Sequence, residues 1–490
     1  MVAAIAAVAM SVMAFGGEAA PPMMGWASWN TYRVNISDKL IMRQADLMKE
    51  LGLDALGYTF VNIDDGWFGG RDESGKLKTH SERFLEGLKC VTDHIHSLGL
   101  KAGIYSDGGE NTCGSYYDDD KMGIGVGLLG HDDEDCRFLF GESDFDFIKV
   151  DFCGGTPCKN FDRVALDHQT RYTEIRQAMD KVRPGLRLNI CCGEYPGAWS
   201  SGVAESWRIS HDVRPRWDNI KDIIKQNLYL SAYASPGHYN DMDMLEAGRG
   251  MSEEEDHTHF AVWCFQSSPL MIGCDLKKLK DRPKLRALLT NRDYIALNQD
   301  IVRPQGEVIK RDGDTYVLVR DVGERFGTKR AVLFLNLEDE AKEMQISLEE
   351  LELAAKDNVK MVQAQVPAHG ARIAWVEGEK RLERTRYEAE WAFIPDYQEL
   401  HDPMKSGTGF YKEVAGASGG MVASNCRRLV WRNVWSENGG EYEITAYSPD
   451  GGAIVSFART LAPGEDEIKI EQTDSLQDID FITIRKITKE

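Results

Sequence analysis

The chain has 490 residues, of which 42% are hydrophobic and 28% charged, a composition typical of a globular protein with two or three domains. Its 58 basic and 79 acidic side chains give a formal net charge of −21. This charge argues against nucleic acid as a partner, because phosphate binding needs clustered Lys and Arg, and it disfavours docking on an anionic membrane surface. Neutral ligands such as sugars remain suitable.

The N-terminus has the pattern of a signal peptide. Met1 to Phe15 carries no charge, and a Gly-Gly-Glu-Ala-Ala segment follows, so residues 1–20 are predicted to be a signal peptide, with an apolar helix packed on the domain as the alternative. No transmembrane segment is predicted after residue 20, because no uncharged apolar stretch of about 18 residues occurs there. The ten cysteines include no CxxC pair, and they fit a secreted or periplasmic protein with one or two disulfides.

Residues 21–300 alternate between short apolar strands and amphipathic helices. Ser37 is expected to cap a helix that stops at Gly52, and a second helix is expected from Leu85 to Leu98. The candidate strands end near Trp26, Asp64, Tyr105, Asp151, Cys191, Ser210, Asp241 and Gly273. Eight βα units over this length predict a (β/α)8 TIM barrel. A doubly wound open sheet is disfavoured, because no glycine-rich phosphate turn follows the first strand.

The remainder of the chain has short strands, polar turns and little helical period. Residues 301–384 are predicted to form an antiparallel β-sandwich. A charged linker from Glu377 to Arg386 is expected to lead into a second C-terminal β-sandwich, residues 385–490, which has glycine-rich turns at 416–420 and 438–440.

Acidic residues follow the candidate barrel strands, where reacting groups of such barrels lie. These residues are Asp64, Asp65, Asp107, Asp151, Glu194, Asp212, Asp241 and Asp243. So many carboxylates at one end indicate either a divalent metal site or the hydrolysis of a glycoside.

A metal site is the weaker of these options. Lys149 lies two residues before Asp151 on one strand, and Arg208 lies four residues before Asp212, so fixed cations accompany the acids and would repel a metal ion. Aromatic residues at the same rim suit the apolar face of a sugar ring: Trp26, Trp29, Trp67 and Tyr105. On the residues alone a glycosidase is favoured, and a metal-dependent lyase or hydrolase and a non-catalytic sugar-binding protein stay open.

A set of motifs in order along the first 300 residues carries a family resemblance. The motifs are Met24-Gly25-Trp26-Ala27-Ser28-Trp29-Asn30, Asn62-Ile63-Asp64-Asp65-Gly66-Trp67, Gly103-Ile104-Tyr105-Ser106-Asp107, Leu129-Gly130-His131, Phe147-Ile148-Lys149-Val150-Asp151-Phe152-Cys153, Ser206-Trp207-Arg208, Asn240-Asp241-Met242-Asp243-Met244-Leu245, Pro269-Leu270-Met271-Ile272-Gly273-Cys274-Asp275 and Asn298-Gln299-Asp300. With them the sequence resembles glycoside hydrolase family 27, which comprises α-galactosidases and α-N-acetylgalactosaminidases. The resemblance implies a TIM barrel followed by a β-sandwich, and a retaining exo-glycosidase that releases terminal α-D-galactosyl residues from oligo- or polysaccharides.

The resemblance also implies roles for individual residues. Asp151 is similar to the nucleophile that forms a covalent glycosyl-enzyme, and Asp212 to the general acid and base. The implied substrate contacts are Asp64 and Asp65 to the 4- and 6-hydroxyls, Lys149 to the 3- and 4-hydroxyls, Arg208 and Glu194 to the 2-hydroxyl, Trp29 and Tyr105 along the ring, and Asp243 close by. A disulfide between Cys113 and Cys153 is implied, and no metal or cofactor is predicted at the site.

Some features leave the exact activity open. Glu194-Tyr195-Pro196 is shorter than the family loop that senses the substituent on C2, so a 2-hydroxyl and a 2-acetamido group are not distinguished. Within the family the alternatives are α-N-acetylgalactosaminidase, β-L-arabinopyranosidase and isomaltodextranase, and Asp64-Asp65 counts against arabinopyranose because it favours a sugar with a 6-hydroxyl. A binding protein without turnover is the alternative from another class. The oligomeric state is open, with a homodimer among the options.

Residues 387–490 have a second, less specific resemblance. Tyr387-Glu388-Ala389-Glu390 and Val430-Trp431-Arg432-Asn433-Val434 are similar to carbohydrate-binding modules of families 6 and 35, which often hold a calcium ion. A purely structural sandwich is the alternative. Because every predicted catalytic group lies before residue 275, a module of this kind predicts that residues 21–384 alone would hydrolyse a small aryl galactoside.

Overall fold

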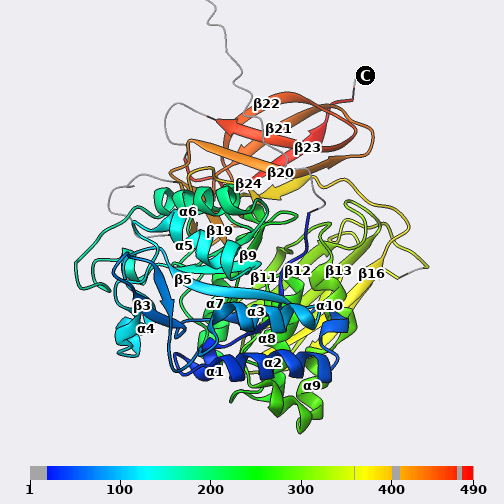
Figure 1. Cartoon of the computed structure of the whole chain (residues 1–490). Coiled ribbons are helices and arrows are strands. Elements are labelled where there is room, and N and C mark those ends of the chain that lie inside the picture. The colour runs from blue at the N-terminus through cyan, green and yellow to red at the C-terminus, as the bar shows by residue number, and fades with distance from the viewer. Residues whose placement is uncertain (1–18, 358, 400–408, 472–476, 489–490) are drawn as a thin grey trace, which may run out of the picture.

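The computed structural model describes residues 19–357, 359–399, 409–471 and 477–488 (Figure 1). Residues 1–18, most of the predicted signal peptide, lie outside the described residues. Within the described part of the chain, no helix is long and apolar enough to cross a membrane.

Eight parallel strands curl in the manner of a (β/α)8 TIM barrel, which confirms the predicted fold, and their order is β10-β1-β2-β5-β6-β7-β8-β9. The strands are β1 (Met24–Ala27), β2 (Phe60–Ile63), β5 (Lys101–Asp107), β6 (Phe147–Asp151), β7 (Arg187–Ile190), β8 (Ser206–Arg208), β9 (Tyr239–Asp241) and β10 (Leu270–Ile272). An isolated parallel bridge between Leu245 and Ile272 joins the segment after β9 to β10. Every residue of β1 and β2 is buried, as expected of parallel strands covered on both faces.

Helices cover the outer face of these strands. They are α1 (Trp29–Tyr32), α2 (Asp38–Glu50), α3 (Gly87–Ser97), α4 (Cys113–Tyr117), α5 (Asp132–Cys136), α6 (His168–Val182), α7 (Trp217–Asn227), α8 (Glu253–Phe265), α9 (Pro283–Leu289) and α10 (Arg292–Gln299). A hairpin of β3 (Phe68–Arg71) and β4 (Leu77–Thr79) follows β2. The predicted helix start at Ser37 is confirmed, since its hydroxyl accepts a hydrogen bond from the Leu40 N–H at 3.2 Å.

The second part of the chain is antiparallel, as predicted. β11 (Glu307–Asp312), β12 (Thr315–Asp321), β13 (Lys329–Asn336) and β16 (Gly370–Glu377) form one sheet, and β14 (Lys342–Ser347) pairs with β15 (Met361–Val366). Alternate residues of β12 and β13, such as Val317, Val319, Val332 and Phe334, form a core of their own between these sheets. We call this part the middle domain.

A third group of antiparallel strands lies at the top of Figure 1, in orange and red, and we call it the C-terminal domain. Its strands are β17 (Arg386–Glu388), β18 (Phe410–Glu413), β19 (Met421–Ser424), β20 (Arg428–Ser436), β21 (Gly440–Tyr447), β22 (Ala453–Leu461), β23 (Gly464–Glu471) and β24 (Phe481–Lys486). The sheet order β17-β24-β21-β22 brings the two ends of this domain together.

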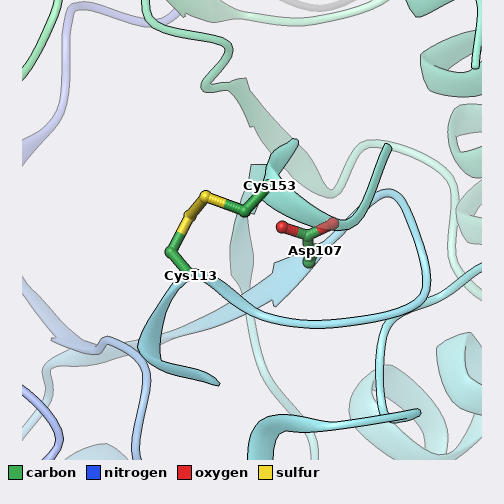
Figure 2. A group of neighbouring side chains, drawn as sticks. All are labelled: Asp107, Cys113 and Cys153. Carbon is green, nitrogen blue, oxygen red and sulfur yellow. A yellow bond between two sulfur atoms is a disulfide. The ribbon is translucent and has the colours of Figure 1, made fainter. Parts of the chain in front are cut away.

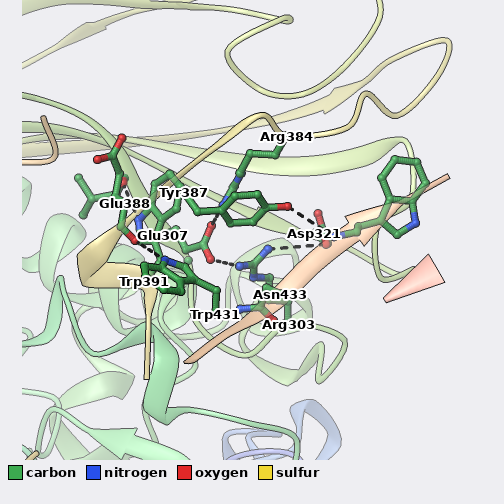
Figure 3. A network of polar contacts seen from close by, with 12 residues as sticks. Arg303, Glu307, Asp321, Arg384, Tyr387, Glu388, Trp391, Trp431 and Asn433 are labelled. Carbon is green, nitrogen blue, oxygen red and sulfur yellow. Dashed lines mark hydrogen bonds and ion pairs between the residues drawn. The ribbon is translucent and has the colours of Figure 1, made fainter. Parts of the chain in front are cut away.

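The charged segment from Glu377 to Arg386, predicted as a linker, makes close contacts with the middle domain. Arg381 donates to Asp321 at 3.0 Å, and Arg384 donates to Glu307 at 2.9 Å; Figure 3 shows Arg384, Glu307 and Asp321 within one network of polar contacts. Carboxylates of the middle domain supply these partners, so the arginines are buried rather than exposed. The indole N–H of Trp391 donates to the Val308 carbonyl at 3.1 Å and adds a further tie between the two domains.

Candidate active site

The predicted substrate-binding residues meet inside the ring of barrel strands. A cavity there is lined by polar groups from neighbouring strands: Asn62, Asp64, Tyr105, Lys149, Asn189, Arg208, Asp241 and Asp243. They converge because parallel strands end at one rim, so residues at corresponding positions face the same space. Five of the eight predicted binding residues are among them.

Lys149 joins two of the predicted acids. Its ammonium nitrogen lies 3.1 Å from Oδ2 of Asp64 and 3.9 Å from Oδ2 of Asp151, and it lies 5.3 Å from the ring centre of Tyr105. Burial raises the pKa of Asp151; the charge of Lys149 opposes this shift, and the charge of Asp212 adds to it. The Asp151 carboxylate also accepts a hydrogen bond from the Phe152 N–H at 3.0 Å, which fixes its orientation.

Arg208 is the second cation of the cavity, and it contacts two further acids. Its guanidinium lies 2.9 Å from Asp243 and 3.2 Å from Asp212. Asp243 adopts a left-handed backbone conformation, with φ +74°, and also accepts from the Val213 N–H at 2.8 Å. The Asp212 side chain is 68% exposed, so it is the acid that faces solvent. Desolvation raises its pKa, but the charges of Arg208 and Lys149 outweigh this and lower it.

Three predicted binding residues do not line this cavity. Asp65 is buried and accepts from the N–H groups of Gly66 (2.8 Å) and Gly114 (2.7 Å), and burial raises its pKa to about 7. The Trp29 ring lies beside the Arg33 guanidinium at 4.3 Å. Glu194 lies in the loop after β7. A sequence pattern cannot show this division, because it fixes the end of a strand but not the path of the loop that follows.

The predicted disulfide between Cys113 and Cys153 is confirmed, with Cα atoms 5.2 Å apart, and it links the segments after β5 and β6 (Figure 2). Asp107 lies beside it and received no role from the sequence. Its Oδ1 accepts from the N–H groups of Gly109 (2.7 Å) and Gly154 (3.0 Å), so it holds the same two segments. Burial and the neighbouring charge of Asp151 raise the pKa of Asp107 well above the usual range.

Among the described residues, one group brings potential metal ligands together. Asp107, Cys113 and Cys153 place ligand atoms within 4.8 Å of one another, but both sulfurs are bonded in the disulfide, so this group does not suit a metal. At the cavity rim, Lys149 and Arg208 occupy the space between the acids.

A second acidic group lies in the C-terminal domain. Glu390 is fully buried, and neither of its carboxylate oxygens has a hydrogen-bond partner in the described part of the chain. Burial raises its pKa well above the usual range, and the charges of Glu388 and Asp480 raise it further. A carboxyl group in this position needs a proton or a cation. Carboxylate oxygens are ligands that calcium prefers, but the carboxylates of Glu388, Glu390 and Asp480 do not all lie within 4.8 Å of one another, so these residues do not fit the ion that the second resemblance implies.

Comparison with known proteins places the barrel in a family. The sequence profile described as "Alpha galactosidase A" matches residues 21–300. The chain is 35% identical over 352 residues to "Alpha-galactosidase A" of Cellvibrio japonicus, covering 69% of this chain and 81% of that protein. It is 37% identical over 305 residues to "Alpha-galactosidase 2" of Arabidopsis thaliana, covering 61% and 72%.

A solved structure agrees with these matches. The structure of alpha-galactosidase I from Mortierella vinacea superposes with a TM-score of 0.67 at 28% identity and covers 75% of this chain and all of that one. The profile match covers more than half of the chain, and the relatives match along the same barrel. The chain therefore belongs to the Alpha galactosidase A family, which is the glycoside hydrolase family 27 predicted from its sequence motifs.

Proposed function

We propose that this protein is a retaining exo-glycosidase that hydrolyses terminal α-D-galactosyl residues of oligo- or polysaccharides. The observation that carries the proposal is the position of two acids beside two cations that line one cavity: Asp151 lies beside Lys149, and Asp212 lies beside Arg208. The printed names of its relatives, alpha-galactosidases of bacteria and plants, support the same substrate.

In this mechanism the Asp151 carboxylate attacks the anomeric carbon while Asp212 donates a proton to the departing glycosidic oxygen. The carbon–oxygen bond to the leaving group breaks, and a covalent glycosyl-enzyme forms on Asp151. Asp212, now a carboxylate, then takes a proton from water, and the resulting hydroxide displaces Asp151. Two inversions leave the product with the configuration of the substrate.

The reaction needs an ionised Asp151 and a protonated Asp212, whereas the free protein raises the pKa of the first and lowers that of the second. A bound sugar raises the pKa of the exposed acid, Asp212. Asp212 is 68% exposed, so a glycoside above it removes water from the carboxylate and favours its neutral form. Lys149 stays beside Asp151 and stabilises the carboxylate.

The remaining polar groups bind hydroxyls of the sugar. Asp64 and Lys149 form an ion pair with unused hydrogen-bonding capacity toward the cavity, which suits neighbouring hydroxyls of one ring face. Asp243 holds Arg208 in place, and Arg208 is directed to the hydroxyl nearest the reacting carbon. Both carboxylate oxygens of Asp65 accept hydrogen bonds from backbone N–H groups. We therefore assign Asp65 a positioning role for Asp64, in addition to its predicted contact with the sugar.

A panel of nitrophenyl glycosides tests this function. The α-D-galactoside should be cleaved faster than the α-N-acetylgalactosaminide and the β-L-arabinopyranoside, and NMR of the first product should show the α-anomer. If another glycoside is cleaved fastest, that glycoside is the substrate, and the enzyme has another activity of the same family. No cleavage, with galactose still bound, would support a sugar-binding protein instead.

The disulfide supports a proposal about location. A bond between Cys113 and Cys153 persists in oxidising compartments, which agrees with a secreted or periplasmic enzyme. Fractionation of the producing cells would test it, with recovery in the cytoplasm as the contrary result.

A further inference from the structure

The C-terminal domain contacts the barrel at the loop that carries Glu194. Backbone hydrogen bonds join the two segments in antiparallel fashion: the Glu399 N–H donates to the Tyr195 carbonyl at 3.1 Å, and the Ala198 N–H donates to the Tyr397 carbonyl at 2.9 Å. A short strand-like pairing therefore links residues that lie 199 and 204 positions apart in sequence.

Aromatic side chains reinforce this pairing. The rings of Tyr195 and Tyr397 are stacked, with centroids 5.3 Å apart and planes at 22°. Tyr233, from the barrel segment before β9, lies 5.2 Å from Tyr195 and 5.3 Å from Tyr397, and its hydroxyl lies 2.9 Å from that of Tyr411. We call Tyr195, Tyr233, Tyr397 and Tyr411 the tyrosine cluster. Tyr195 is fully buried in it, so the loop after β7 is anchored by a residue next to Glu194.

Two glycines of the loop lie close to neighbouring segments. Gly197 has φ +132°, and a Cβ placed on it would lie 3.1 Å from the Cβ of Gln398. At the other end, a Cβ on Gly193 would lie 3.2 Å from Nδ1 of His211, the neighbour of Asp212. The loop is thus held between the C-terminal domain and the segment that carries the predicted general acid.

We propose that Tyr397 is a positioning residue for recognition of the substituent on C2 of the sugar. The inference rests on the proposed function and on the contact of Glu194 and Arg208 with the 2-hydroxyl that the family resemblance implies. The loop after β7 is short, and the C-terminal domain supplies the wall that fixes it. Tyr397 acts through Tyr195, and Glu399 is close enough for the charge of Glu194 to act on it. Displacement of a binding group by about 1 Å costs up to about a hundredfold in rate.

The same contacts change the activity expected of a chain truncated after residue 384. Residues 21–384 contain every predicted catalytic group, yet they lack the segment that holds the loop of Glu194. Removal of a carbohydrate-binding module attached by a linker would leave the rate of hydrolysis of a small galactoside unchanged. Removal of a C-terminal domain that forms part of the site wall would lower this rate.

The test uses the full chain with Tyr397→Ala, and with Tyr397→Leu as a milder change that keeps apolar bulk. Tyr447→Ala is the matched control, because Tyr447 also stacks on a ring, Phe481 at 4.8 Å, but on the outer sheet of the same domain. Nitrophenyl α-galactoside is compared with its 2-deoxy and 6-deoxy analogues. In both Tyr397 variants, kcat/KM for galactoside relative to the 2-deoxy analogue should fall about tenfold. The ratio to the 6-deoxy analogue should stay within twofold.

Hydrogen exchange of the peptide covering residues 193–200 provides a readout that does not need activity. Exchange should be faster in the Tyr397 variants than in the wild type and unchanged in Tyr447→Ala, because the Ala198 N–H loses its fixed acceptor. If a wild-type chain that cleaves galactosides shows neither change on substitution of Tyr397, the inference is wrong and the proposed function stands. If the wild type cleaves no galactoside, the proposed function fails and the assignment to C2 fails with it. An equal loss on all three substrates would show a general structural role and would also overturn the inference.

Discussion

The ammonium group of Lys149 lies 3.9 Å from Oδ2 of Asp151, two residues further along strand β6. Residues at i and i+2 of a strand point to the same face, so the strand itself, rather than a loop, sets this distance. The strand therefore holds the cation beside the proposed nucleophile before any substrate binds. Substitutions of either residue should change turnover for this reason.

Replacement of Asp151 by Asn should lower kcat at least about a thousandfold, because the amide cannot form the glycosyl-enzyme. The fold should be retained, since the amide oxygen still accepts from the Phe152 N–H. Steady-state kinetics and a melting curve measure the two effects. Asp212→Asn is the companion variant, and it should keep more activity on aryl galactosides with good leaving groups. A variant Asp151→Asn that turns over normally would remove Asp151 from the chemistry.

Replacement of Lys149 by Met should move the acidic limb of the kcat/KM profile to higher pH. The charge of Lys149 lowers the pKa of Asp151, so its removal raises that pKa, and the reactive carboxylate then forms only at higher pH. Lys149→Arg keeps the charge and should leave the limb close to its wild-type position, even if KM rises. A limb that moves to lower pH in the Met variant would contradict the assignment.

Replacement of Glu352 by Gln should lower the free energy of unfolding by about 3–5 kcal/mol at pH 7. Burial raises the pKa of Glu352, but Arg384, Arg330 and Arg381 outweigh it and lower this pKa to about 2. A lowered folded-state pKa stabilises the protein above pH 4.5, and this stability is lost as the pH falls toward 2. The difference between variant and wild type should therefore narrow in acid.

The control for this experiment is Glu443→Gln, because Glu443 pairs with Arg485 at the surface, where ion pairs contribute about 0–1 kcal/mol. Urea unfolding at several pH values gives both free energies. Equal effects of the two substitutions at pH 7 would show that the buried network does not hold the domains together.

Calcium and a chelator should both leave the melting temperature of the wild type unchanged, because the carboxylates of Glu388, Glu390 and Asp480 do not meet at the spacing of calcium ligands. Glu390→Gln should melt close to the wild type, since the buried Glu390 carboxyl has no hydrogen-bond partner in the described residues that the amide would lose. Activity should also survive chelation, since Lys149 and Arg208 accompany the acids of the barrel. A melting temperature that rises with calcium in the wild type but not in Glu390→Gln would show that a cation binds at Glu390.

The barrel could be predicted almost completely from the sequence. The predicted strand ends near Asp151 and Asp241 are the observed ends, and the other six differ by one or two residues. The Ser37 cap and the following helix were predicted as well. These features depend on short-range patterns, which include the period of apolar residues, a capping side chain and the polar residues after each strand.

Contacts between distant segments could not be predicted in this way. The charged residues from 377 to 386 indicated a linker but not its partners, since Arg381 and Arg384 pair with carboxylates that lie 29 to 77 positions away in sequence. The stacking of Tyr195 on Tyr397 could not be predicted either, because no periodic pattern in the sequence relates these two residues. Such partners follow from how domains pack and not from local preference.

The bond between Cys113 and Cys153 has a consequence for how the enzyme is made. Synthesis and folding place the two thiols close together, but the loops become linked only when an oxidant removes two electrons. Enzyme made under reducing conditions should therefore contain chains with unlinked loops, and its specific activity should rise when an oxidant such as oxidised glutathione is supplied together with a thiol–disulfide exchange catalyst.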